Sequence, residues 1–211
     1  NELRVQIGRI RQLIDALDIP IVERELYEAD DVIGSLSLQL ANRGFEVIVL
    51  TGDTDLLQLA GDHVTVYLPG VKRFDDFRQY DTAAVVERYG FGPEFVPDYK
   101  ALVGDTSDNI PGVPGIGEKT AKALITSYGS IESIFDHVDE VTPTRAQNAL
   151  RGNRDHAMRS KHLATIVRDL DFELDPESAR IDDFDREAVV GLMRDLEIRS
   201  LLNRIPDTKR V

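Results

Sequence analysis

The sequence predicts an α/β fold with a mostly parallel central sheet flanked by helices, followed by a C-terminal helical region. Three observations support this fold class. Short apolar runs alternate with helix-like segments up to about residue 95, as in α/β units. One of these runs, FEVIVL at 45–50, is more apolar than a half-exposed strand requires. After residue 95 the segments read as helices only.

The first 95 residues contain the elements of the predicted sheet. Residues 3–17 carry apolar side chains at helical spacing, and the short run IVE after Pro20 suggests a strand. A second helix is predicted over 28–42, with Gly44 in its C-terminal cap. We expect residues 45–50 to form a strand buried on both faces. The next predicted elements are a strand-to-helix turn at 51–59, a strand at 63–68 and a helix at 81–89.

The rest of the chain is predicted to be helical. Helices or helical turns are expected at 97–103, 117–128, 130–137, 143–151, 154–168, 185–195 and 198–203. No low-complexity linker separates the two parts. We therefore divide the chain into an α/β core at 1–95 and a helical region at 96–211 that belongs to the same domain.

Composition excludes several classes of site. The 211 residues include no Cys, so a disulfide, a thiolate zinc site and a cysteine nucleophile are excluded. No apolar run approaches the ~18 residues needed to cross a bilayer. A net charge of −13 taken alone disfavours nucleic-acid binding. The charge is unevenly distributed, however, because residues 141–168 carry six basic residues against one acid.

Three short acidic runs stand at the ends of predicted elements. The first, YEADD at 27–31, opens the second helix; the second, TGDTD at 51–55, follows the buried strand; the third, GDTSDN at 104–109, follows a helix. Ligand sites in open α/β sheets lie beyond the carboxyl ends of strands, where the second run is placed. Together the runs supply seven carboxylates: Glu28, Asp30, Asp31, Asp53, Asp55, Asp105 and Asp108.

Each acidic run has an ordinary structural interpretation when it is considered singly. Acids in a first helical turn favour the helix dipole, Asp53 or Thr54 could cap a helix, and a polar turn would explain the third run. If the runs converge, their mutual repulsion requires cations. Hard oxygen ligands favour Mg²⁺ or Mn²⁺ over Zn²⁺, and two such ions activate water and stabilise the leaving oxygen in phosphodiester cleavage. An aspartyl-phosphate phosphatase, with Asp53 as its nucleophile, is a weaker alternative.

A glycine-rich turn precedes the helix predicted at 117–128. Residues 110–122 read IPGVPGIGEKTAK. Glycines let backbone approach a ligand closely, and amides at a helix start bind phosphate. Lys119 and Lys122 would add cationic contacts. The spacing does not match a P-loop, because Glu118 separates Gly117 from Lys119.

The order and spacing of three stretches resemble a known family. YEADDVIGSL, VLTGDTDLLQL and YKALVGDTSDNIPGVPGIGEKTA are similar to the 5′-nuclease (5′→3′ exonuclease) domain of bacterial DNA polymerase I, in the flap endonuclease superfamily. The resemblance runs from about residue 3 to about residue 205. It implies removal of 5′ flaps or RNA primers in replication and repair, and a bacterial, cytoplasmic and nucleoid-associated location.

The resemblance also implies roles for individual residues. The seven carboxylates named above would hold two or three divalent ions, with Asp53, Asp55, Asp105 and Asp108 closest to the chemistry. The glycine hairpin (residues 111–117) would belong to a helix–three-turn–helix motif that grips duplex DNA, commonly with a K⁺ ion held by main-chain carbonyls. The residues implied in DNA contact are Gly112, Gly115, Gly117, Lys119, Thr120 and Lys122. Residues 1–95 would then be the catalytic core and 96–211 the DNA-binding region, with a polymerase domain expected after Val211.

One departure from the family pattern concerns the start of the chain. Family members begin with a strand that carries a further metal-binding Asp, followed by a basic segment that arches over the 5′ end of the substrate. Residues 1–27 match neither, so we expect the catalytic core to lack these N-terminal elements. The alternative function that follows is a duplex-DNA-binding chain without catalysis.

Overall fold

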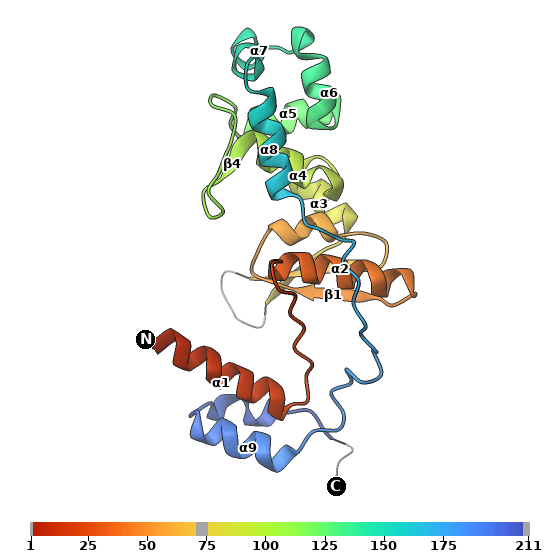
Figure 1. Cartoon of the computed structure of the whole chain (residues 1–211), viewed down its shortest axis with the longest axis vertical. Helices are drawn as coiled ribbons and strands as arrows, with labels where there is room; N and C mark the ends of the chain where they lie inside the picture. Colours follow the sequence, from red (N-terminus) through yellow and green to blue (C-terminus); the bar gives the residue numbers. More distant parts are fainter. Residues whose placement is uncertain (1, 71–75, 209–211) are drawn as a thin grey trace. The chain divides into compact units, whose positions relative to one another are not determined.

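The computed structural model describes residues 2–70 and 76–208, and its residue contacts divide the chain into two compact units (Figure 1). The smaller unit comprises Asn1–Glu25 with Phe172–Val211, and the larger comprises Leu26–Asp171. All three acidic runs and the glycine hairpin lie in the larger unit. The predicted change from mixed to helical structure at about residue 95 also falls inside it. Among the described residues, no helix combines the length and apolarity needed to cross a membrane.

The smaller unit is built from helices at the two ends of the chain. Helices α1 (Glu2–Ala16) and α9 (Arg186–Asp195) and the 3₁₀ helix η4 (Arg199–Arg204) confirm the helical predictions there. Its core is formed by Phe184, Val189 and Met193, against which Leu13 and Leu17 pack. The strand predicted after Pro20 is wrong, because residues 19–24 have no regular structure. A three-residue run behind a proline, which has no amide hydrogen, offers few donors to a sheet.

The sheet of the larger unit has three described strands. Strands β1 (Val47–Leu50), β2 (Val64–Pro69) and β3 (Phe77–Tyr80) lie in the order β1-β2-β3. The predicted parallel pairing is found between β1 and β2, with Val47 opposite Val64. Strand β3 was not predicted, and it pairs with β2 in the antiparallel direction. Helix α2 (Ala29–Asn42) packs against β1, as Figure 1 shows.

Two features of this part position the second acidic run. Strand β1 leads into the buried 3₁₀ helix η1 (Asp55–Leu59), which lies within the strand-to-helix turn predicted at 51–59. The expectation that β1 is buried on both faces is wrong: Val49 is buried, whereas Ile48 and Leu50 are 62% and 63% exposed. Only the face that carries Val49 packs into the core formed by the described residues.

Helices dominate the rest of the larger unit. They are α3 (Thr82–Tyr89), η2 (Pro93–Phe95), α4 (Val96–Val103), α5 (Glu118–Tyr128), α6 (Ile131–Asp136), η3 (Val138–Glu140), α7 (Thr144–Leu150) and α8 (Arg154–Ala164). Helix α4 packs against α8 and α5 (Figure 1). The expectation that strands stop after residue 95 is wrong in one place, where β4 (Gly104–Asp105) and β5 (Ile110–Pro111) pair antiparallel.

The segment after α8 runs along α2. Helix α8 ends at Ala164, before the predicted residue 168. The Val167 amide then donates to Asp31 Oδ1 at 2.8 Å, and Ser35 Oγ donates to the Val167 carbonyl at 3.2 Å. Gly34 permits this approach, because a Cβ there would lie 2.6 Å from Ile166 Cγ2. These side-chain hydrogen bonds hold the irregular segment 165–170 against α2.

Candidate metal centre and glycine hairpin

The second and third acidic runs come together in the structure. Asp55, at the start of η1, lies beside Asp105 at the end of β4 and Asp108 in the loop between β4 and β5. Each contributes one carboxylate oxygen to a group in which all the atoms lie within 4.8 Å of one another. Asp55 is buried, Asp105 is half-buried and Asp108 is exposed. The group therefore opens to solvent on the side of Asp108, and we call these three residues the acidic site.

Asp53 shapes the turn that presents Asp55. Its Oδ1 accepts a hydrogen bond from the Asp55 amide at 2.9 Å, and its own amide donates to Thr51 Oγ1 at 3.0 Å. Thr54 stands at the N-cap of η1 but makes no side-chain cap hydrogen bond. Local capping therefore uses one oxygen of Asp53 and neither oxygen of Asp55. This leaves the Asp55 carboxylate for the acidic site.

The first acidic run is divided between two tasks. Burial raises the pKa of Asp30, and the nearby negative charges of Asp53, Glu28 and Asp108 raise it further. Asp31 and Glu28 form a capping box at the start of α2, and Asp31 also anchors the segment after α8 through the Val167 amide. The structure thus brings Asp30 toward the acidic site, while Asp31 and Glu28 hold the helix start.

Lys100 contacts the acidic site, and the sequence reasoning missed it. It lies on α4, is only 8% exposed, and its ammonium contacts Asp55 Oδ1 and lies 2.5 Å from Asp105 Oδ2. Hydrogen bonds from Lys100 and from Ser107 hold the pKa of Asp105 well below its ordinary value. The available signal was a lone lysine beside the apolar residues Ala101 and Leu102, since a buried lysine needs an acidic partner.

The loop that carries Asp105 and Asp108 is joined to the glycine hairpin. Strands β4 and β5 pair Gly104 with Pro111, directly before the hairpin turns. A Cβ on Gly112 would lie 2.5 Å from the Gly104 amide nitrogen and closer still to the Val103 carbonyl group. Only glycine allows two backbones to cross at this separation. We call the crossing of Gly104 and Gly112 the root of the hairpin. Because the two backbones are in contact there, the hairpin cannot move without moving the loop that follows β4.

The hairpin is anchored to the core by buried side chains and is exposed at its tip. Val113 and Ile116 are buried, while Pro114 and Gly115 are exposed. The Val113 amide donates to the Leu102 carbonyl at 2.8 Å. Two residues before Val113, the Pro111 carbonyl accepts a hydrogen bond from Ser160 Oγ at 3.0 Å. Gly115 has φ +91°, a left-handed conformation that favours glycine.

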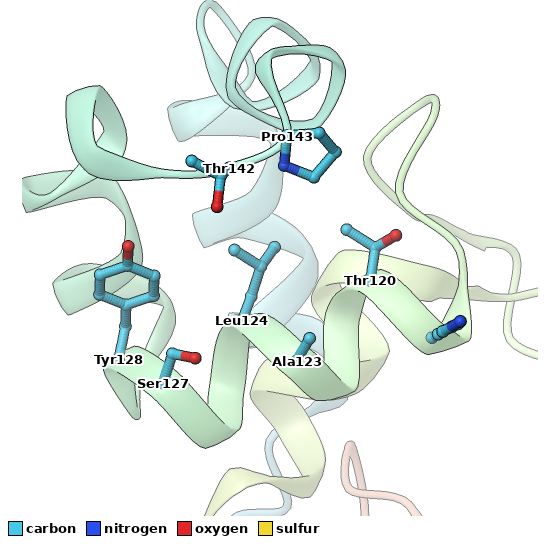
Figure 2. A pocket seen from close by; sticks show the side chains of 8 residues that line it. Thr120, Ala123, Leu124, Ser127, Tyr128, Thr142 and Pro143 are labelled. Carbon is cyan, nitrogen blue, oxygen red and sulfur yellow. The ribbon is translucent and has the colours of Figure 1, made fainter.

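The cations that follow the hairpin face two directions. Lys119 and Thr120 are among the residues that line a cavity of about 370 Å³ along α5. Figure 2 shows Thr120 on the side of α5 that faces Thr142 and Pro143. Lys122 instead donates to the Arg88 carbonyl at 3.2 Å and lies 5.2 Å from the centre of the Tyr89 ring. Lys122 thus contacts α3, and Lys119 is the exposed cation beside the hairpin.

Much of the basic stretch at 141–168 is neutralised locally. Lys161 pairs with the buried Asp98 at 2.8 Å and with Glu132 at 2.9 Å. Arg151 pairs with an acid of η3, and Arg154 pairs with an acid of α6. Arg145 and Arg159 are exposed, so the uncompensated charge of this stretch is smaller than the sequence indicates.

The donor set fits a hard divalent cation. The acidic site consists of carboxylates alone, the ligands that Mg²⁺ and Mn²⁺ prefer. Two oxygens bound to one Mg²⁺ at about 2.1 Å lie at most about 4.2 Å apart. Since the oxygens of Asp55, Asp105 and Asp108 already lie within 4.8 Å of one another, small side-chain rotations suffice to bring them onto one ion.

Fold and site together define a class: α/β proteins that gather carboxylates beyond a strand end and continue into a helical part through a glycine-rich hairpin. Comparison with family models gives the particular family. Residues 1–90 match the 5′-3′ exonuclease N-terminal resolvase-like domain, and residues 91–187 match the 5′-3′ exonuclease C-terminal SAM fold. The chain belongs to the 5′-3′ exonuclease family.

Curated relatives agree with this family. The chain is 45% identical over 204 residues to DNA polymerase I of Bacillus caldotenax, an alignment that covers 97% of this chain and 23% of the relative. It is 46% identical over 213 residues to DNA polymerase I of Chloroflexus aurantiacus, with 98% and 22% covered. The chain thus spans less than a quarter of the length of these relatives.

Solved structures show the same fold. The zinc-bound T5 5′-exonuclease is similar with a TM-score of 0.61 at 22% identity, over 85% of this chain and 62% of that one. The catalytic core of Rad2 in complex with a DNA substrate is similar with a TM-score of 0.60 at 14% identity, over 97% and 70% of the two chains. At these identities the likeness concerns the fold.

Proposed function

We propose that the chain is a metal-dependent, structure-specific 5′ nuclease, a 5′→3′ exonuclease and flap endonuclease that hydrolyses phosphodiesters of DNA or primer RNA. One observation carries the proposal: the loop of Asp105 and Asp108 and the glycine hairpin share a root at the crossing of Gly104 and Gly112. A site for hydrolysis and a surface for backbone phosphates are therefore held in fixed register. The family and the fold support the same function.

The proposed division of labour follows the geometry. Backbone amides at the exposed tip of the hairpin, at Gly115 and Gly117, contact phosphates of the duplex, and Lys119 adds a positive charge. A K⁺ ion held by carbonyls of residues 111–117 would complete this surface. Affinity should consequently fall with salt and depend little on base sequence.

In the proposed function, the carboxylates bind the metal ions that hydrolysis requires. Asp55, Asp105 and Asp108 would hold Mg²⁺ or Mn²⁺, Asp53 and Asp30 would add negative charge near them, and Glu28 and Asp31 fix the start of α2. When two or three divalent ions are bound, they supply activation of water and stabilisation of the leaving oxygen. The residues of this chain orient the scissile phosphate by fixing the distance from the hairpin to the acidic site.

The proposed partners are duplex DNA with a 5′ flap or a 5′ end, and RNA-primed DNA. The relatives are named DNA polymerase I and are more than four times longer than the matched region, which supports a polymerase domain in the same polypeptide. The bacterial relatives support a place of action at bacterial DNA.

The test is cleavage of a 5′-labelled flap duplex in Mg²⁺ by the wild type and by Asp53→Asn. The wild type should release the flap, and Asp53→Asn should bind the duplex but lose cleavage. A matched control is Asp62→Asn, an exposed acid in the loop before β2, which should cleave normally. Binding by the wild type without cleavage would establish the alternative of a non-catalytic duplex-binding chain.

A further inference from the structure

Lys100 has an unusual position for a lysine. Its side chain is 10% exposed and lies on α4 next to Ala101 and Leu102, which are fully buried. A lysine in such surroundings is charged only if carboxylates compensate the loss of water. Asp55 and Asp105 supply this compensation, and both belong to the acidic site.

The ammonium of Lys100 and a divalent cation would need the same oxygens. Lys100 contacts Asp55 Oδ1 and Asp105 Oδ2, which come from two different acidic runs. One positive charge between these two carboxylates leaves a net negative charge, and Asp108 adds to it from the exposed side. The arrangement therefore remains attractive to a second cation of higher charge, while its central position is held by the lysine.

We propose that Lys100 is an internal counter-cation of the acidic site, which bridges Asp55 and Asp105 in the metal-free protein and yields these oxygens when a divalent cation binds. The inference rests on the proposed function, since it assumes a metal at these carboxylates. Two consequences follow. Lys100 stabilises the metal-free fold by preventing repulsion between the runs, and it weakens metal binding, because the ion must displace an ammonium and then bind near it.

A permanent salt bridge would behave differently. If Lys100 only supported Asp105 from outside, its removal would loosen the ligand and weaken metal binding, as loss of a group that orients a ligand usually does by about 10–100-fold. Exchange predicts the opposite sign, so the direction of the change in affinity separates the two arrangements.

The first experiment measures Mn²⁺ binding by calorimetry, and thermal unfolding in EDTA and in Mn²⁺, for the wild type and Lys100→Met. Methionine keeps the length of the side chain and suits the apolar neighbours. We expect Lys100→Met to unfold at a lower temperature in EDTA, to gain more from Mn²⁺ than the wild type does, and to bind Mn²⁺ about tenfold more tightly, a change of about 1.4 kcal/mol.

Lys161→Met is the matched control. Lys161 also lies between two carboxylates, those of Asp98 and Glu132, but neither belongs to the acidic site. Its loss should lower the unfolding temperature by the same amount in EDTA and in Mn²⁺ and leave the Mn²⁺ affinity unchanged. An unchanged or weaker affinity in Lys100→Met, with normal binding by the wild type, overturns the counter-cation inference alone. Absence of Mn²⁺ binding by the wild type overturns the proposed metal site itself.

A second experiment needs no variant, so it decides the matter even if Lys100→Met does not fold. Acetylation of the wild-type lysines by a water-soluble active ester is followed by mass spectrometry with and without Mn²⁺. Lys100 should be protected in EDTA and become several-fold more reactive in Mn²⁺, while Lys161 should not change. Equal protection of Lys100 in both buffers would show that the ammonium does not leave its carboxylates.

Discussion

Replacing Gly112 with alanine tests the shared root of the hairpin and the acidic loop. The added Cβ would lie 2.5 Å from the Gly104 amide nitrogen and even closer to the Val103 carbonyl group. All of these atoms belong to backbone, so no rotamer change can relieve the contact. The root must open, and the pairing of Gly104 with Pro111 must shift with it.

The expected loss of stability is large for a single methyl group. Overpacking by added carbon atoms costs typically about 1–3 kcal/mol, and the absence of a flexible neighbour places Gly112→Ala near about 3 kcal/mol. For domains of about 150–250 residues, each kcal/mol corresponds to roughly 2–4 °C. Gly112→Ala should therefore lower the midpoint of thermal unfolding by about 6–12 °C.

Gly117→Ala is the control within the same hairpin. A Cβ on Gly117 meets nothing within 4 Å, and the residue stands at the N-cap of α5 with φ −101°, where the difference between glycine and alanine is modest, up to about 1 kcal/mol. Thermal unfolding followed by circular dichroism measures both variants. If Gly112→Ala unfolds within about 2 °C of Gly117→Ala, the crossing is not tight and the argument for a rigid register fails.

Two further predictions concern buried charge. Asp98 is 1% exposed and accepts hydrogen bonds from the Ile131 amide at 2.7 Å and from Lys161. Asp98→Asn should therefore lower the free energy of unfolding in urea by about 2–4 kcal/mol. A loss below about 1 kcal/mol would contradict a stabilising role for the buried Asp98 carboxylate. The pKa of Asp105 is held below its ordinary value by Lys100, so Asp105 contributes stability that is complete above about pH 4 and is lost as the pH falls toward the lowered pKa. In metal-free buffer the difference in unfolding free energy between the wild type and Asp105→Asn should therefore shrink as the pH falls below about 4, whereas a constant difference would show that the lowered pKa of Asp105 does not contribute to stability.

Local sequence patterns were sufficient for most helices, and they drew attention to the acidic runs, of which Asp55, Asp105 and Asp108 lie together in the structure. The amphipathic spacing in residues 3–17 and the helices predicted at 28–42 and 81–89 correspond to α1, α2 and α3. The position of the second run beyond a strand was enough to place Asp55 at a site shared with another run.

Contacts between segments far apart in the sequence could not be predicted from these local patterns. Strands β4 and β5 have two residues each, too few for any periodicity, and they exist because Gly104 and Gly112 cross. The exposure of one face of β1 was not predicted either, because apolar content alone does not show whether another element covers the side of the strand that carries Ile48 and Leu50. Lys100 was missed because its partners lie on segments that only the fold brings together.

The flap-cleavage assay, applied to one carboxylate from each acidic run, tests the central claim most directly. The claim is that the three runs form one metal-dependent site. Asp30→Asn, Asp53→Asn and Asp108→Asn should each reduce Mg²⁺-dependent release of the 5′ flap by about a hundredfold or more, with duplex binding retained. Full cleavage by any one of the three variants would remove that run from the site and contradict the account.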